Sequence, residues 1–155
     1  MSRGPACLLD SNILLRVSRR ADPHYDDIRT ALISYRTRAV RLCYTSQTLG
    51  EFWNVSTRPS DQNGFGLSIA ETDVIAQEIE KDFEFLPDSQ AVHERWRSLL
   101  VKYEIKGVRV HDARLAASMY IHNVAELLTI NVRDFGRFEG LTIVHPADVN
   151  PAAAQ

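Results

Sequence analysis

The chain has 155 residues, of which 45% are hydrophobic and 25% are charged, a composition typical of a globular protein long enough to bury a core. The formal net charge of −2 does not favour general binding to nucleic acid, and no stretch approaches the 18 or so consecutive apolar residues of a membrane-spanning helix. The first apolar run is too short for a signal peptide, so we expect a cytoplasmic protein with one domain over residues 1–148 and a short disordered tail over 149–155.

In the first half of the chain, apolar runs, capping residues and prolines predict strands that alternate with helices. We expect, in order, a strand at 6–9, a short helix at 13–17, a helix at 23–38 capped by Asp22, a strand at 40–44 and a helix at 47–57 capped by Thr45 or Ser46. Cys7 and Cys43 lie in the two strands without metal-ligand spacing, which predicts buried thiols.

The second half continues the alternation after a turn-rich segment at 60–66, which we expect to be an exposed loop. The predicted elements are a helix at 68–81, a strand at 83–86, a helix at 93–103 capped by Asp88, a helix at 113–121 and strands at 126–130 and 141–144. The core sides of the first two helices are expected at Ile69, Val74, Ile75 and Ile79, and at Trp96, Leu99 and Leu100. This order predicts an α/β protein, a three-layer α/β/α fold with a mainly parallel central sheet.

Four acidic side chains lie at strand ends or helix starts, where a parallel sheet places its functional site. Asp10 follows the first strand, Glu51 is near the start of the helix at 47–57, Asp112 precedes the helix at 113–121, and Asp134 follows the strand at 126–130. Two carboxylates about 4 Å apart repel by roughly 4 kcal/mol at an effective dielectric near 20, so such a cluster needs a cation. Carboxylate oxygens suit Mg²⁺ or Mn²⁺, and an ion held in this way activates water for phosphodiester hydrolysis.

Each acid also has a purely structural interpretation. Asp10 and Asp112 are good helix caps, Asp134 suits a short turn, and Glu51 on an amphipathic helix is commonly a solvated charge. The pair His111-Asp112 would suit a metal phosphohydrolase, but the other histidines lack the spacing of further ligands. The coincidence of all four acids at strand ends and helix starts is what favours a shared site.

Four motifs resemble the PIN-domain family, especially the VapC-like toxins of bacterial toxin–antitoxin pairs. They are Leu-Leu-Asp-Ser-Asn-Ile-Leu-Leu at 8–15, Thr-Ser-Gln-Thr-Leu-Gly-Glu-Phe at 45–52, His-Asp-Ala-Arg-Leu-Ala-Ala at 111–117 and Leu-Thr-Ile-Asn-Val-Arg-Asp-Phe at 128–135. Each motif is weak alone, but their order and spacing make the match fairly specific. The resemblance implies a PIN-like fold and a metal-dependent endoribonuclease, often a homodimer, whose site a small antitoxin blocks.

Carried over to this chain, the resemblance implies that Asp10, Glu51 and Asp112 are the core ligands of Mg²⁺ (or Mn²⁺). Asn131 is a departure, because many relatives have a fourth Asp there. Either Asp134 supplies that charge or a second metal site is weaker than usual. The Asn also leaves open a PIN-like module that binds RNA or acts as a scaffold without cleaving.

Other residues are candidates for supporting roles. Ser11 and Thr129 are candidates to orient water or phosphate, and Asn12 to hold Asp10 in place, with Asn131 in the same supporting group. Arg16, Arg114 and Phe65 are candidate RNA contacts, although Phe65 equally suits an aromatic anchor of an ordinary turn. A phosphatase of the haloacid-dehalogenase type would need a second Asp at position 12, where this chain has Asn. The sequence leaves open which RNA is cut, which antitoxin binds and whether one or two metal ions are held.

Overall fold

The computed structural model describes residues 3–149. Its strands are β1 (Ala6–Leu9), β2 (Arg41–Thr45), β3 (Glu84–Leu86), β4 (Glu126–Leu128) and β5 (Thr142–Val144). Its α-helices are α1 (Ser11–Leu14), α2 (Tyr25–Thr37), α3 (Ser46–Thr57), α4 (Ile69–Asp82), α5 (Gln90–Lys102) and α6 (Val110–His122). Four short 3₁₀ turns join them: η1 (Ser60–Gln62), η2 (Gly107–Arg109), η3 (Val132–Phe135) and η4 (Pro146–Asp148). No helix in this part of the chain is long and apolar enough to cross a membrane.

The five strands form one sheet in the order β3-β2-β1-β4-β5, and every neighbouring pair is parallel. The strands β2 and β3 follow in order on one side of β1, whereas β4 and β5 lie on its other side. The strand order therefore reverses between β1 and β4. In open α/β sheets, the carboxyl ends of the strands at such a reversal form the usual ligand-binding crevice.

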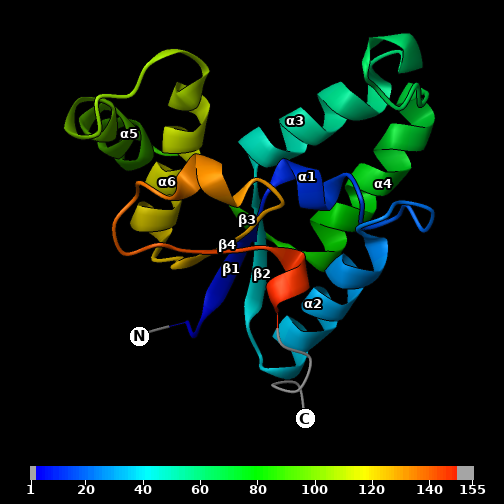
Figure 1. The fold of residues 1–155 in the computed structure, drawn as a ribbon, viewed down its shortest axis with the longest axis horizontal. Helices are drawn as coiled ribbons and strands as arrows, with labels where there is room; N and C mark the ends of the chain where they lie inside the picture. Colours follow the sequence, from blue (N-terminus) through cyan, green and yellow to red (C-terminus); the bar gives the residue numbers. More distant parts are fainter. Residues whose placement is uncertain (1–2, 150–155) are drawn as a thin grey trace.

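Helices cover both faces of the sheet, which confirms the predicted three-layer α/β/α fold. Figure 1 shows α5 and α6 on one side of the sheet and α2, α3 and α4 on the other. Residues of β1 alternate between the two cores: Leu8 packs with the α5–α6 layer, whereas Cys7 and Leu9 pack with the layer of α1 to α4. Both Cys7 and Cys43 are buried free thiols, as predicted.

Two predicted helix caps are wrong, because both helices begin at residues other than those predicted. The helix predicted from residue 23 begins at Tyr25, and Asp22 instead accepts a hydrogen bond from the His24 backbone N–H (2.9 Å). The cap of α5 is Ser89, whose hydroxyl accepts from the Val92 N–H at 3.2 Å. Asp88, the predicted cap, instead pairs with Arg114 of α6 at 3.1 Å.

The predicted core side of α4 is also partly wrong. Ile69 is 62% exposed and Val74 is 58% exposed, whereas Thr72, Ala76 and Ile79 are buried. These three residues form a row with the helical spacing i, i+4, i+7, and this row faces the rest of the protein. Hydropathy alone favoured the larger side chains over the polar Thr72.

Two other predicted segments are more ordered than expected. The loop at 60–66 is exposed from Ser60 to Asn63 but turns inward at Phe65, whose N–H donates to the Val55 carbonyl at 2.9 Å. Val149, which the prediction placed in the disordered tail, is 7% exposed and packs in the core. The remaining tail residues, 150–155, lie outside the described part of the chain.

Candidate functional site

The site lies at the carboxyl ends of β1 and β4, where the strand order reverses. Asp10 directly follows β1 and Thr129 directly follows β4, and the Asp10 N–H donates to the Leu128 carbonyl at 3.1 Å. The parallel pairing of Leu9 with Leu128 therefore brings together two residues that are 119 positions apart.

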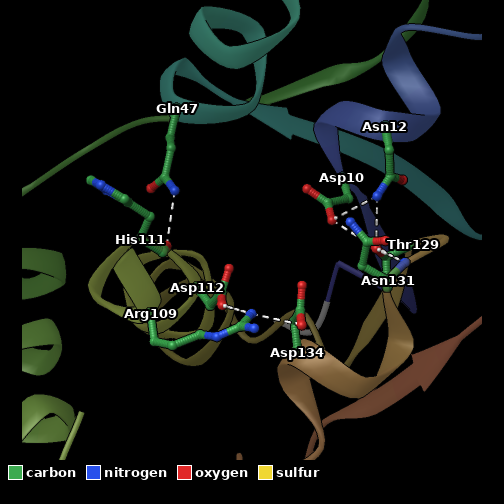
Figure 2. Close-up of polar contacts among 9 residues, drawn as sticks. All are labelled: Asp10, Asn12, Gln47, Arg109, His111, Asp112, Thr129, Asn131 and Asp134. Carbon is green, nitrogen blue, oxygen red and sulfur yellow. Dashed lines mark hydrogen bonds and ion pairs between the residues drawn. The ribbon is translucent and has the colours of Figure 1, made fainter. Parts of the chain in front are cut away.

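The Asp10 carboxylate is only 6% exposed and is held on both of its oxygens. Oδ1 accepts from the Ser11 backbone N–H at 2.7 Å, so Asp10 does cap α1. Oδ2 accepts from the Thr129 hydroxyl at 2.7 Å and from Asn12 Nδ2 at 3.3 Å (Figure 2). The structural and functional interpretations of Asp10 are therefore compatible, because capping fixes the orientation of the carboxylate.

Asn12 and Thr129 link the two strand ends around Asp10. Asn12 Nδ2 donates to Thr129 Oγ1 at 3.1 Å, and Asn12 Oδ1 accepts from the Ile130 N–H at 3.2 Å. Thr129 Oγ1 also accepts from the Asn131 backbone N–H at 3.0 Å. The contacts of Asn12 are those of a residue that holds Asp10 in place, whereas Asn131 joins the network through its backbone.

Glu51 is held by a residue that the sequence did not single out. Gln47, one helical turn earlier on α3, donates from Nε2 to Glu51 Oε1 at 3.2 Å. The same nitrogen donates to the His111 carbonyl at 2.9 Å, which ties α3 to the first turn of α6 (Figure 2). The spacing i, i+4 between Gln47 and Glu51 was the available sequence signal.

Asp112 and Asp134 share one arginine, which was also missed. Arg109 Nη1 lies 3.2 Å from Asp112 Oδ2 and 2.6 Å from Asp134 Oδ1. Because α6 begins at Val110, Asp112 lies in its first turn and is not the predicted cap. Figure 2 shows Asp10, Asp112 and Asp134 facing a common space, with the Arg109 guanidinium between the last two.

The acids influence one another electrostatically. The pKa of Asp10 is raised to about 6, chiefly by burial and also by the charges of Glu51 and Asp112, while the hydrogen bonds from Thr129 and Ser11 lower it. The pKa of Asp112 is raised by burial and by Asp134 and Glu51, while Arg109 opposes the rise. Four carboxylates from four segments thus lie within electrostatic reach of one space.

The donor chemistry suits a hard divalent cation, but the side chains are not arranged around one. Within residues 3–149, no three His, Cys, Asp or Glu side chains form a ready-made metal site. Asp112 and Asp134 are turned to Arg109, and Asp10 is bound by the protein's own donors. A hollow of about 350 Å³ lined by Asn131 and Asp134 adjoins this space. Carboxylate oxygens are the ligands that Mg²⁺ and Mn²⁺ prefer, so the residues fit the ion in chemistry.

The three candidate RNA contacts all have partners within the protein. Arg16 donates to the Asn12 carbonyl at 2.8 Å and pairs with Asp22 at 3.2 Å, and Arg114 pairs with Asp88 at 3.1 Å. The Arg19 guanidinium lies 3.6 Å from the centre of the Phe65 ring, so this aromatic serves as an anchor. Contact of any of the three with RNA stays a prediction.

An all-parallel sheet with acidic residues at its β1–β4 reversal is the arrangement of one known class of protein. The family model described as "PIN domain" matches residues 7–141, and the chain belongs to this family. This confirms the resemblance that the four sequence motifs indicated.

Solved structures with the same fold include chains of several toxin–antitoxin complexes. One is a chain of the VapBC2 complex of Rickettsia felis bound to a promoter DNA fragment. It is 16% identical to this chain with a TM-score of 0.66, and the match covers 90% of this chain and 98% of that chain. A chain of a Klebsiella pneumoniae toxin–antitoxin complex is 25% identical with a TM-score of 0.59 (90% and 97%). The Mycobacterium tuberculosis toxin VapC20, described as cleaving the sarcin–ricin loop, is 15% identical with a TM-score of 0.59 (78% and 86%). No curated protein matches the sequence.

Proposed function

We propose that this protein is a metal-dependent endoribonuclease that hydrolyses RNA phosphodiester bonds, and that it is the toxin of a toxin–antitoxin pair. The observation that carries the proposal is the convergence of Asp10, Asp112 and Asp134 on one space at the reversal of the sheet (Figure 2). Glu51 lies close enough for its charge to raise the pKa of both Asp10 and Asp112. Membership of the PIN domain family and the shared fold of VapC20 support the proposal.

In this proposal the four acids hold Mg²⁺ or Mn²⁺, which supplies an activated water and neutralises charge on the phosphate. The chain's other residues prepare the ligands. Thr129 and Asn12 fix Asp10 on the two strand ends, and Gln47 restrains Glu51 while it ties α3 to α6. This division of roles follows the pattern in which hydrogen bonds to a ligand orient it toward the ion.

The proposed partners are an RNA substrate, a cognate antitoxin and a second copy of the chain. Similar structures of VapBC and other toxin–antitoxin complexes support the antitoxin. The homodimer and RNA as the class of substrate rest on family resemblance, and a cytoplasmic location stays a prediction from the sequence.

The test is cleavage of a mixed pool of tRNA and single-stranded RNA by the purified protein, with Mg²⁺, with Mn²⁺ and with EDTA. We expect cleavage with either ion and none with EDTA, and loss of cleavage in Asp112→Asn. Asp73→Asn is the matched control, because Asp73 lies on α4 and contacts only the exposed Gln77 among the contacts described. Equal cleavage by wild type and Asp112→Asn would mean that the activity comes from another site or a contaminant.

Substitutions of Thr129 test whether its hydroxyl orients Asp10 for activity. Thr129→Val removes the hydroxyl that binds Asp10 and keeps the shape, so we expect a loss of roughly 10- to 100-fold, typical for a residue that orients a metal ligand. Thr129→Ser keeps the hydroxyl and should retain most of the activity. Full activity in Thr129→Val would remove this residue from the mechanism.

A second candidate function is an RNA-binding or scaffold module that cleaves weakly or not at all. The exposed Asn131, which occupies a position where many relatives carry Asp, favours it. Well-folded protein that binds the RNA pool but leaves it intact with both ions would support this alternative.

A further inference from the structure

Arg109 occupies a position that a metal ion would need. Its guanidinium contacts Asp112 and Asp134 with the same nitrogen, at 3.2 Å and 2.6 Å. These two acids come from α6 and η3, two segments joined here by one cation. The remaining acids have no such partner among the described contacts: Asp10 accepts only from uncharged donors, and Glu51 from the Gln47 amide.

Contact with Arg109 and binding of a metal ion oppose each other at these carboxylates. A guanidinium that donates to a carboxylate oxygen places a positive charge beside any divalent cation on the same carboxylate, and the two positive charges repel. The arrangement also explains why the acids converge without forming a ready-made metal site within residues 3–149. Arg109 already offsets part of the combined charge of Asp112 and Asp134 from within the chain.

Arg109 can leave without disturbing the core. Its side chain is 44% exposed, and its neighbour Val108 is 77% exposed. The backbone of η2 enters α6 directly, so a change of side-chain rotamer moves the guanidinium into solvent while Asp112 keeps its place on the helix. Water can therefore replace the carboxylates around Arg109, and another cation can replace Arg109 beside the carboxylates, at little cost in free energy.

We propose that Arg109 is an internal counter-cation that competes with the divalent metal ion for Asp112 and Asp134, so that its side chain sets the affinity of the site for metal. This inference rests on the proposed function, because it assumes that these carboxylates bind metal. By linkage, each favourable contact of Arg109 with the acids weakens metal binding, and metal binding releases Arg109.

The test is isothermal titration of Mn²⁺ into metal-free wild type, Arg109→Gln and Arg109→Lys, without RNA. Arg109→Gln keeps a polar side chain but has no charge, so we expect Mn²⁺ affinity to rise by about fivefold or more, the range of typical coupling between competing sites. Arg109→Lys keeps the charge but not the planar fork, so its affinity should be intermediate.

Arg114→Gln is the matched control for the change in net charge. Arg114 lies on α6, which directly follows the η2 turn that carries Arg109. It is 45% exposed and pairs with Asp88, which is not one of the four acids. Its Mn²⁺ affinity should stay within about twofold of wild type, because exposed charges away from the site are screened. An equal rise in both variants would attribute the effect to net charge and overturn the proposal.

The remaining outcomes separate this inference from the function on which it rests. If wild type binds Mn²⁺ and Arg109→Gln binds it no more tightly, Arg109 does not compete and the inference is wrong, while the nuclease proposal stands. If only Arg109→Gln binds measurably, the competition is strong and the inference is supported. If none of the folded proteins binds Mn²⁺ or Mg²⁺, the metal-dependent function fails and the inference fails with it.

Discussion

Asp10 combines deep burial with a complete set of hydrogen bonds, and this combination determines its behaviour. Burial and two nearby acids favour its protonated form, whereas Thr129 and Ser11 stabilise the anion, and the pKa settles near 6. The protein therefore keeps a carboxylate at a position where its negative charge is costly. Such a tension between stability and function is expected at a site that binds a metal ion.

The raised pKa of Asp10 predicts a pH dependence of the metal-free protein's stability. The folded protein binds this proton more tightly than the unfolded chain, in which the pKa is near 3.8, so the stabilising contribution is present below that pKa and is lost as pH rises through about 6. The measurement is urea unfolding of wild type and Asp10→Asn in EDTA at about pH 4 and about pH 7. The variant's stability relative to wild type should increase with pH, by up to about 3 kcal/mol. A relative stability that is constant or decreases with pH would contradict the raised pKa.

The turn between α3 and α4 depends on a close approach of two backbone segments. After α3 ends, three N–H groups of residues 65–67 donate back to carbonyls of α3 or its C-cap, at 2.9 Å each. This return path brings Gly64 against Arg58, where a Cβ on Gly64 would lie 1.9 Å from the Arg58 carbonyl oxygen. The turn therefore requires glycine at position 64 for lack of space.

Two Gly→Ala variants test this account of the turn. Gly64→Ala should lower the free energy of unfolding by about 1–3 kcal/mol, because the turn must shift to admit the methyl group. Gly50→Ala is the control, since a Cβ there meets nothing within 4 Å and the residue is exposed in α3, where Ala is the better helix former by roughly 0.5–1 kcal/mol. Urea unfolding measures both. Equal effects of the two variants would show that packing at Gly64 is not the constraint.

For single helices and strands, the sequence predicts most of the structure that local interactions determine. The apolar runs identified every strand to within two residues, because buried strands in a parallel sheet are continuously hydrophobic. The caps were less predictable: Thr45 was one of two candidates for its helix, and Ser89 replaced Asp88 because neighbouring polar residues compete for the same N–H groups. The buried side of α4 depended on the partner helix, which no local pattern contains.

At the scale of the whole molecule, the site draws on both helical layers and the sheet. Glu51 comes from α3 on one face, Asp112 from α6 on the other, and Asp10 from the end of the central strand. The sequence predicted the class of fold but not the order of the strands. The expected convergence of the acids followed from that class. The contacts of Gln47 with His111 and of Arg109 with Asp134 could not be anticipated, because they depend on side-chain directions across separate elements.

This arrangement predicts that metal binding stabilises the whole fold. If the ion binds the assembled acids and not the unfolded chain, Mn²⁺ at about 100 times its dissociation constant should add about 2.7 kcal/mol. For a chain of this size that corresponds to a rise in Tm of roughly 5–10 °C, measurable by calorimetry with and without EDTA. Asp112→Asn should abolish most of the rise, and Asp73→Asn should leave it unchanged. A rise of the same size in Asp112→Asn would place the ion elsewhere.

The pairing of β1 with β4 has a consequence for the order in which the protein is made. Thr129 meets Asp10 only after β4 has been added beside β1, 119 residues later in the chain. A ribosome delivers the amino-terminal strand first, so a nascent chain carries Asp10 for most of its synthesis without the partners that orient it. The orientation of Asp10 by Thr129 is therefore completed only after the second half of the sheet has emerged from the ribosome.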